Sequence, residues 1–355
     1  MKSGTTFRQA INKLNEIDFN SSKEHHVFNA IYEDILQGLA TKKDTGEFYT
    51  PRAVTQFIID MVNPKLGEKI IDPACGTAGF LVCAIEHLNK QVKNVADRKS
   101  LQETITGTEL KPLPFMLSVV NLITHDIEVP QILNTDALSR ELTSLRQVDK
   151  VDIIVANPPF GGVVGDGMET NFPLNYRTKE SADLFLILFI QLLKDGGRAG
   201  IVLPDGSLTG EGVKQRVRQK LLEDCNVHTI VRLPQSVFAP YATVNTNLIF
   251  FEKGKKTKDI WYYEHTLPEG YKAYSKTKPI QISEFDEIKK WWTKRTEHEF
   301  AYKVSIDTII ERGYDLDIKN PNKIVEEVSY NREEIIQTIK HNQNEISKLI
   351  RELEL

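Results

Sequence analysis

Residues 69–80 read KIIDPACGTAGF, a short apolar run that ends in the acidic Asp72 and passes into a glycine-containing turn. A strand, a tight turn and a helix in this order allow backbone N–H groups to approach a nucleotide-like ligand closely, because Gly76 and Gly79 carry no Cβ atom. We therefore expect a cofactor-binding loop at this point. The alternative is a purely structural turn between a strand and a helix.

Two further acidic residues follow later β-rich runs. A dinucleotide site would need glycines spaced G-x-G-x-x-G and an acid about 20 residues further on, and this loop has neither. Instead, Glu109 stands 30 residues beyond Gly79, where a carboxylate at the end of a neighbouring strand can accept both hydroxyls of a ribose. Asp136 could accept from an adenine amino group or act as a helix N-cap. A solvated loop acid remains the alternative for Glu109.

Short β-rich runs alternate with helical stretches through the middle of the chain. Such alternation predicts an α/β fold with a mainly parallel sheet covered by helices on both faces, and ligands at the carboxyl ends of its strands. Before this region, residues 7–40 show helical spacing; after it, residues 332–355 form a charged helical pattern with apolar residues on a three-four repeat. The β-rich runs are residues 69–71, 104–107, 151–155, 198–202 and 247–251.

The most specific pattern is Asn157-Pro158-Pro159-Phe160, directly after the run 151–155 and Ala156. Two prolines remove two backbone donors and fix φ, so the corner is rigid and rich in acceptors. Asn157 can present its side-chain carbonyl, and Pro158 its main-chain carbonyl, to the two N–H donors of an exocyclic amine. Phe160 can stack on the ring that carries this amine. The alternative is a proline-braced loop with a packed phenylalanine.

Composition narrows the class of protein. The chain has 355 residues, with 45 Lys plus Arg against 49 Asp plus Glu and a formal net charge of −4. A protein that binds DNA tightly by itself usually carries a strongly basic domain, so we do not expect unaided tight binding. The 40% hydrophobic content is typical of a globular protein and argues against disordered or disulfide-stapled classes.

The cysteine pattern and the apolar segments point to a cytoplasmic protein. Three cysteines without ligand-pair spacing fit a reducing compartment and imply no structural zinc. The first residues lack the apolar stretch of a signal peptide. The run 184–193 is too short to span a bilayer, so we expect a buried helix there and no membrane segment. We expect no metal site.

These motifs, in this order, resemble those of S-adenosylmethionine-dependent amino-methyltransferases that act on DNA. The stretch 46–52, GEFYTPR, narrows the resemblance to modification (M) subunits of type I restriction-modification systems. Residues 203–206, LPDG, and 231–238, VRLPQSVF, are typical of that family's catalytic domain, and the resemblance runs from about residue 31 to 253. It implies a Rossmann-like methyltransferase fold.

The resemblance also implies roles for individual residues. Glu47 to Arg52 and Thr77 to Gly79 would hold the methionine part of the cofactor, and Glu109 would hold its ribose. Asn157 to Phe160 would hold an adenine swung out of the duplex. Ala78 stands where the family commonly has glycine, which slightly narrows the approach of the backbone without preventing binding. The residues implied in cofactor binding are Glu47, Phe48, Tyr49, Thr50, Pro51, Arg52, Asp72, Gly76, Thr77, Ala78, Gly79, Glu109 and Asp136.

The implied reaction is direct transfer of the sulfonium methyl group to the adenine N6 amine, without a metal or a covalent intermediate. Methylation of a cytosine ring carbon would need a cysteine nucleophile, and Cys75 lies within the cofactor loop. Two alternatives stay open. One is an amine methyltransferase acting on the N4 amine of cytosine or on another substrate through the same corner. The other is a scaffold without catalytic activity.

The resemblance further implies a division of labour between subunits. A separate specificity (S) subunit would recognise the double-stranded DNA sequence, and a restriction (R) subunit and a second M subunit are further partners that such systems allow. We predict four segments. They are a shortened N-terminal helical segment (1–45), the catalytic domain (46–255), a mixed C-terminal extension (256–330) and a C-terminal helix (331–355) that docks a partner or packs on its own domain.

Overall fold

The computed structural model of the chain describes Arg8, Asn12 and residues 50–239, 244–275, 277–323 and 332–353. It divides into two compact units, Met1–Asn320 and Pro321–Leu355. The predicted N-terminal helical segment, residues 1–45, lies outside the described residues except for Arg8 and Asn12.

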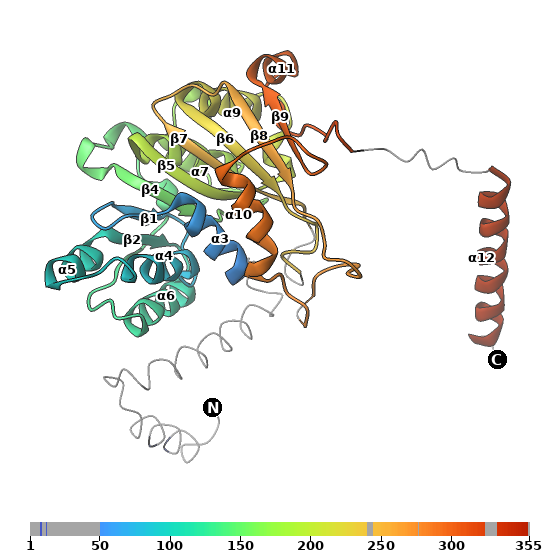
Figure 1. Cartoon of the computed structure of the whole chain (residues 1–355), viewed down its shortest axis with the longest axis horizontal. Helices are drawn as coiled ribbons and strands as arrows, with labels where there is room; N and C mark the ends of the chain where they lie inside the picture. The colour runs from blue at the N-terminus through green and yellow to red at the C-terminus, as the bar shows by residue number, and fades with distance from the viewer. Residues whose placement is uncertain are drawn as a thin grey trace. The chain divides into compact units, whose positions relative to one another are not determined.

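The first unit alternates strands and helices along the chain (Figure 1). Its strands are β1 (Ile70–Asp72), β2 (Ile105–Glu109), β3 (Gln131–Asn134), β4 (Val151–Ala156), β5 (Leu193–Pro204), β6 (Cys225–Arg232), β7 (Thr246–Lys253), β8 (Asp259–Glu264) and β9 (Ala301–Ser305). Its described helices are α3 (Arg52–Val62), α4 (Gly79–Asn89), α5 (Val95–Thr104), α6 (Pro112–Thr124), α7 (Ser181–Leu192), α8 (Asp205–Leu208), α9 (Val213–Asp224), α10 (Asp286–Thr293) and α11 (Ile306–Glu311).

The nine strands of the described residues form one sheet in the order β3-β2-β1-β4-β5-β7-β6-β8-β9. Strands β3, β2, β1, β4 and β5 are parallel to one another, and β6 is parallel to β8. Strand β7 is antiparallel to both β5 and β6, and β9 is antiparallel to β8. The predicted α/β fold with a mainly parallel sheet is confirmed. The chain leaves β1 toward β2 and β3 and then crosses to β4 on the other side of β1. This is the switch point at which open α/β sheets bind ligands.

The sheet contains more strands than the sequence runs predict. Strands β1, β2, β4, β5 and β7 contain or overlap the five predicted runs, and β3 is the strand expected before Asp136, whereas β6, β8 and β9 were not predicted. The sheet also continues past the predicted boundary at residue 255, because β8 pairs with β6 and β9 pairs with β8. The first part of the predicted segment 256–330 is therefore continuous with the sheet.

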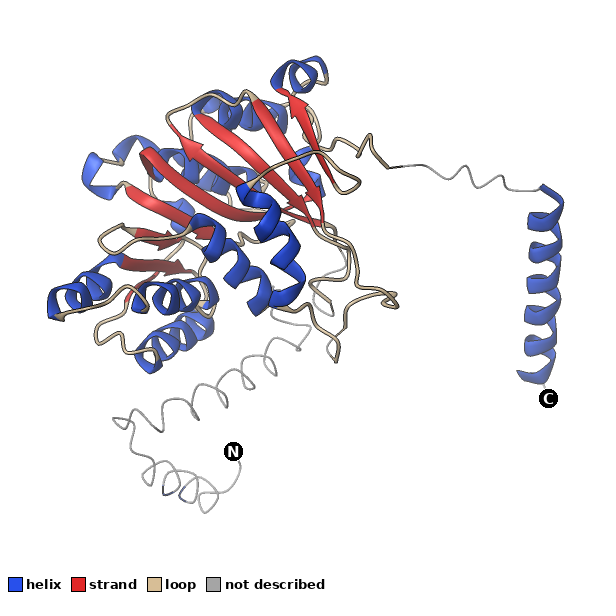
Figure 2. Ribbon diagram, in the orientation of Figure 1, coloured by secondary structure: helices blue, strands red, loops and turns tan. Residues whose placement is uncertain are grey.

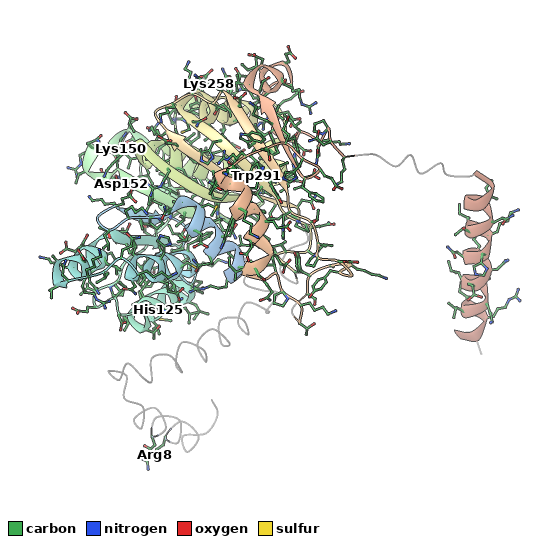
Figure 3. All side chains as sticks on the ribbon, viewed as in Figure 1. Arg8, His125, Lys150, Asp152, Lys258 and Trp291 are labelled. Atoms are coloured by element: carbon green, nitrogen blue, oxygen red, sulfur yellow. The ribbon has the colours of Figure 1, made fainter. Side chains whose placement is uncertain are left out.

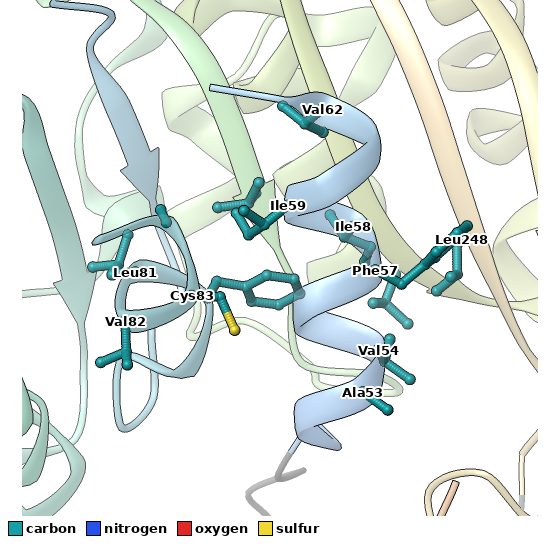
Figure 4. Close-up of a cluster of buried hydrophobic side chains, with 14 of the residues drawn as sticks. Ala53, Val54, Phe57, Ile58, Ile59, Val62, Leu81, Val82, Cys83 and Leu248 are labelled. Atoms are coloured by element: carbon teal, nitrogen blue, oxygen red, sulfur yellow. The ribbon is translucent and has the colours of Figure 1, made fainter. Parts of the chain in front are cut away.

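Helices cover both faces of the sheet (Figure 2). One hydrophobic cluster contains the buried side chains of α3, α4 and α10, and the other contains those of α7 and α9. Figure 4 shows α3 between Cys83 of α4 and Leu248 of β7. A Cβ atom at Gly200 of β5 would come within 2.7 Å of the Ile58 side chain on α3, so glycine is required for this close approach.

The aromatic residues after β7 belong to this core. Trp291 of α10, labelled in Figure 3, packs against Tyr263 of β8 with a ring-centroid distance of 5.1 Å. The predicted buried helix 184–193 is confirmed as α7, whose described side chains are all buried except Gln191. Within the described part of the chain, no helix combines the length and the apolar character needed to cross a bilayer.

The second unit contains α12 (Arg332–Leu353), so the predicted helical tail is confirmed as a helix. Its exposed large apolar side chains are Ile336, Ile339, Ile346, Leu349 and Ile350. Isoleucines 336, 339, 346 and 350 follow the three-four spacing that the sequence shows. A helix with an exposed apolar stripe of this kind is a candidate for docking against another helix.

Candidate active site

A cavity of about 410 Å³ opens at the carboxyl ends of β1, β2, β3 and β4, on the switch point of the sheet. This volume falls in the range of small-molecule and cofactor sites, roughly 300–1,000 Å³. The predicted site residues that line it are Gly76, Glu109, Asp136, Asn157 and Pro159. The remaining lining residues are Pro73, Ala74, Leu110, Lys111, Thr135, Ala137, Leu138, Gly162, Val163, Val164, Gly165, Ser181 and Phe185.

The loop after β1 is held in a tight turn by hydrogen bonds from its backbone N–H groups to the Asp72 side chain and to β2. The Ala74 N–H group donates to Asp72 Oδ1 at 3.0 Å, and the Cys75 N–H group donates to the Thr108 carbonyl on β2 at 3.0 Å. Gly76 has a φ of +54°, the left-handed region that glycine enters without strain. The turn places Gly76 in the cavity wall immediately before α4 begins.

Ala78 is also in the left-handed region, with a φ of +68°, although it carries a Cβ atom. It is fully buried at the N-cap of α4 and does not line the cavity. A left-handed conformation costs a non-glycine residue about 1–2 kcal/mol. The effect of having alanine where the resemblance implies glycine is therefore local backbone strain, with no methyl group in the cavity wall.

The carboxyl group of Asp72 has an unusually high pKa for an aspartate. Its side chain is 1% exposed, and this burial raises the pKa of its carboxyl group to about 8. The nearby Glu109 carboxylate also raises the pKa, whereas the hydrogen bond from Ala74 opposes the rise. Asp72 is therefore mainly protonated at neutral pH in the folded chain.

This shift predicts a pH-dependent stability effect. The pKa of Asp72 rises from 3.8 to about 8 on folding, so between these values the folded state holds a proton that the unfolded state releases. The free energy of unfolding contributed by this group falls as pH rises through that window. We expect Asp72→Asn to raise the melting temperature more at pH 8 than at pH 5, measured by thermal denaturation of both proteins. An equal change at both pH values would contradict the assignment.

Glu109 ties the first two strand ends together. Its Oε2 accepts the Gly76 N–H group at 2.9 Å, and its Oε1 accepts the Lys111 N–H group at 2.8 Å. A carboxylate offers about four acceptor positions, so it can accept ribose hydroxyls together with these backbone donors. The geometry fits the predicted ribose role, because the side chain is fixed at the cavity wall by main-chain contacts from both sides.

Asp136 forms the N-cap that the sequence offered as one of its two interpretations. Its Oδ1 accepts the Leu138 N–H group at 2.8 Å and caps the short 3-10 helix Ala137–Ser139. It also lines the cavity. The capping role is confirmed, and a contact to an adenine amino group stays a prediction.

The corner after β4 presents an acceptor without a donor. Asn157 Nδ2 donates to Thr50 Oγ1 at 2.9 Å, whereas Asn157 Oδ1 is buried and accepts no hydrogen bond from the described part of the chain. A buried acceptor left unpaired costs about 1–3 kcal/mol, and an N–H group from a ligand would remove that cost. The corner is therefore suited to a ligand that donates hydrogen bonds.

The other members of this corner have different surroundings. Pro158 is buried, and Pro159 is exposed and lines the cavity. The Ser181 hydroxyl donates to the Pro159 carbonyl at 2.9 Å, which braces the corner against α7. Phe160 is half-buried against the hydrophobic cluster and is not among the cavity-lining residues, so its stacking role stays a prediction.

The stretch predicted to hold the methionine part of the cofactor is only partly described. Glu47, Phe48 and Tyr49 lie outside the described residues. The Pro51 carbonyl accepts the N–H groups of the first turn of α3, and Arg52 pairs with Glu86 of α4 at 2.6 Å. Thr77, Ala78 and Gly79 directly follow the cavity-lining Gly76 in sequence but do not line the cavity themselves.

Sequence reasoning missed several residues of the site. Asn121 of α6 is 3% exposed and donates from Nδ2 to the Thr77 carbonyl at 2.7 Å, so it supports the loop between β1 and α4 across 44 residues of sequence. Residues 162–165 and two α7 residues, Ser181 and Phe185, line the cavity. The glycine-rich sequence directly after Phe160 was a usable signal for the first group, whereas no local pattern marks Asn121 or α7.

No group of three or more His, Cys, Asp or Glu side chains among the described residues is arranged to hold a metal ion. The three cysteines, Cys75, Cys83 and Cys225, are buried and form no disulfide. Burial raises the pKa of the Cys75 thiol well above its usual value, so this side chain is an uncharged, buried part of the loop after β1.

Comparison with known proteins places this geometry in a family. The sequence model of N-6 DNA Methylase matches residues 23–329. The type I restriction enzyme EcoEI methylase subunit of Escherichia coli is 51% identical over 362 residues, which cover 99% of this chain and 73% of that protein. Three further curated type I methylase subunits match over 49–57% of their own length, so the chain spans only about half of these relatives.

Solved structures give the same result. A type I restriction enzyme modification subunit from Vibrio vulnificus YJ016 is 45% identical with a TM-score of 0.84, covering 89% of this chain and 69% of that one. A second solved chain comes from a study of complex assembly and conformational transition of the type I R-M system. It is 37% identical to this chain, with a TM-score of 0.86. It covers 99% of this chain and 75% of the other.

Proposed function

The chain belongs to the N-6 DNA methylase family, and from this membership we propose that it is the methyltransferase subunit of a type I restriction-modification system. In this proposal it transfers the methyl group of S-adenosylmethionine to the N6 amine of a flipped adenine in double-stranded DNA. A separate specificity subunit supplies the recognition of the DNA sequence.

The observation that carries the proposal is the hydrogen-bonding state of Asn157. Its Oδ1 atom is a buried acceptor without a donor from the described residues, at the rim of a cavity of cofactor size. The exocyclic amine of adenine has two N–H donors. Acceptance of these donors by Asn157 Oδ1 and by the Pro158 carbonyl would draw the amine nitrogen toward a tetrahedral, more nucleophilic form.

S-adenosylmethionine fits the remaining features of the cavity. Glu109 would hold its ribose and Asp136 would contact its adenine. Thr77 to Gly79 and the stretch Glu47 to Arg52 would hold its methionine part. When bound, this cofactor supplies a methyl group that is activated by attachment to a sulfonium. The chain itself orients the two reactants and excludes water from the space between them.

The first test is the class of substrate. We expect labelled methyl groups from S-adenosylmethionine to appear on DNA in the presence of the specificity subunit, and not on RNA or protein incubated under the same conditions. The family membership favours DNA, because the matched model is that of a DNA methylase. Transfer to RNA or protein in place of DNA would contradict the proposal, as would failure of the folded chain to bind the cofactor.

The exposed apolar stripe of α12 is proposed as the docking element for the specificity subunit. Its isoleucines repeat at the spacing of a helix that packs against another helix. A restriction subunit and a second M subunit are further partners within the same proposal. A cytoplasmic location follows from it, since the DNA substrate is there.

Deletion of residues 332–355 should weaken the complex with the specificity subunit by at least about tenfold, because the apolar stripe would be lost. Thermal denaturation should show that the catalytic domain remains folded. Co-purification and calorimetric titration of the two subunits measure the effect. A double substitution on the same stripe, Ile339→Glu with Ile346→Glu, should weaken the complex similarly, and an unchanged complex with either variant would contradict the docking role.

A further inference from the structure

We propose that Thr50 is a positioning residue for the catalytic corner, holding the Asn157 amide so that its carbonyl end is the one left for the substrate amine. The resemblance implies only a cofactor role for this residue. The inference rests on the proposed function, since it assigns to Thr50 a task in orienting the target base.

The contact itself is specific and spans the chain. Thr50 Oγ1 accepts a hydrogen bond from Asn157 Nδ2 at 2.9 Å, across 107 residues of sequence. Both side chains are partly buried. The other end of the same amide, Oδ1, is buried and receives no hydrogen bond from any described residue. Thr50 therefore satisfies the donor end of the amide, and the acceptor end remains.

The backbone next to Thr50 is anchored. Pro51 follows it directly and forms the N-cap of α3, with its carbonyl accepting the N–H groups of Val54 and Thr55 at 2.9 and 3.1 Å. Helix α3 is packed into the hydrophobic cluster by Val54, Phe57 and Ile58, each 0% exposed. Thr50 therefore stands directly before a helix that is packed into the core, which restricts the position of its hydroxyl.

The chemistry explains why this orientation matters. The two ends of an amide have nearly the same shape, but the nitrogen only donates hydrogen bonds and the oxygen only accepts them. The target amine donates hydrogen bonds, so it needs the amide oxygen as its acceptor. In an inverted amide, the N–H groups of Asn157 would face the N–H groups of the amine, and no hydrogen bond could form. Fixing the amide on a rigid neighbour before the base arrives is preorganisation of the kind that active sites require.

The variant that tests this role is Thr50→Val, which keeps the branched shape and removes the hydroxyl. Thr50→Ser is the matched control, because it keeps the hydroxyl and loses only a methyl group. With the specificity subunit and its DNA, we expect Thr50→Val to lower the single-turnover methyl transfer rate by about 10- to 30-fold. The dissociation constants for S-adenosylmethionine and DNA should stay within about threefold, because the Thr50 hydroxyl is already engaged by Asn157 and we assign the contact of this stretch with the cofactor to its main chain. Thr50→Ser should stay within about threefold of the unchanged chain in all three quantities.

A second measurement does not depend on activity. In protein labelled with ¹⁵N-asparagine, the Asn157 side-chain amide signal is identified by its loss in Asn157→Ala. We expect the hydrogen-bonded N–H signal of this amide to move in Thr50→Val and to keep its position in Thr50→Ser.

The outcomes separate the two proposals. An unchanged amide signal and an unchanged rate in Thr50→Val would overturn the positioning role. Loss of cofactor binding in Thr50→Val would also overturn it, in favour of a direct cofactor contact. Absence of methyl transfer by the unchanged chain would contradict the proposed function instead, and the amide signal would still decide the contact between Thr50 and Asn157.

Discussion

Replacing Asn157 with alanine is expected to lower the rate of methyl transfer to DNA by about 10²–10³-fold, the cost of removing one preorganised polar group at a reacting centre. The side chain provides the buried acceptor Oδ1, and alanine leaves only the main-chain carbonyl of Pro158 to orient the amine. Single-turnover transfer of a labelled methyl group, with saturating cofactor and specificity subunit, measures this effect.

The same variant should bind S-adenosylmethionine with nearly unchanged affinity, because Asn157 is proposed to contact the base and not the cofactor. Asn175→Ala provides a matched control, since Asn175 is exposed and does not line the cavity. A variant at Asn157 that keeps its transfer rate would contradict the assignment of the corner to the amine. Loss of cofactor binding together with activity would move Asn157 to the cofactor site.

Replacing Glu109 with alanine is expected to weaken S-adenosylmethionine binding by roughly 10- to 150-fold, the range of about 1.5–3 kcal/mol for hydrogen bonds to a charged group. The carboxylate is already fixed by the N–H groups of Gly76 and Lys111, so little ordering is needed when ribose hydroxyls bind. Isothermal titration with the cofactor gives the dissociation constant directly.

Two further variants separate the causes of this loss. Glu109→Gln keeps the shape and loses the charge, so its affinity should lie between those of the unchanged chain and Glu109→Ala. Glu128→Ala removes an exposed carboxylate after α6 and should leave cofactor binding unchanged. Thermal denaturation checks that the loops held by Glu109 remain folded. Equal cofactor affinity in Glu109→Ala and the unchanged chain would remove the ribose role.

Local sequence patterns were sufficient to predict those features whose chemistry depends on residues adjacent in sequence. The strand, acid and glycine turn of residues 69–80 predicted β1, the loop and α4, and the Asn157 corner was predicted from four consecutive residues. Both features depend on backbone restrictions that single residue types impose. The position of the cavity followed from the rule for parallel sheets.

Contacts between distant segments could not be predicted in this way. The hydrogen bond between Thr50 and Asn157 joins residues 107 apart, and that between Gly76 and Glu109 joins residues 33 apart. Neither leaves a periodic signal, because each depends on which helices and strands become neighbours in the fold. Strand β8 was also not predicted, although its aromatic residues favour a strand.

The direct test of the central claim is the identity of the methylated nucleoside. DNA carrying the recognition site is incubated with this chain, its specificity subunit and labelled S-adenosylmethionine, then digested to nucleosides and separated by chromatography with mass detection. We predict that the label is recovered as N6-methyldeoxyadenosine. Recovery of the label as N4-methyldeoxycytidine, or of unmethylated DNA from a folded complex that binds the cofactor, would contradict the claim.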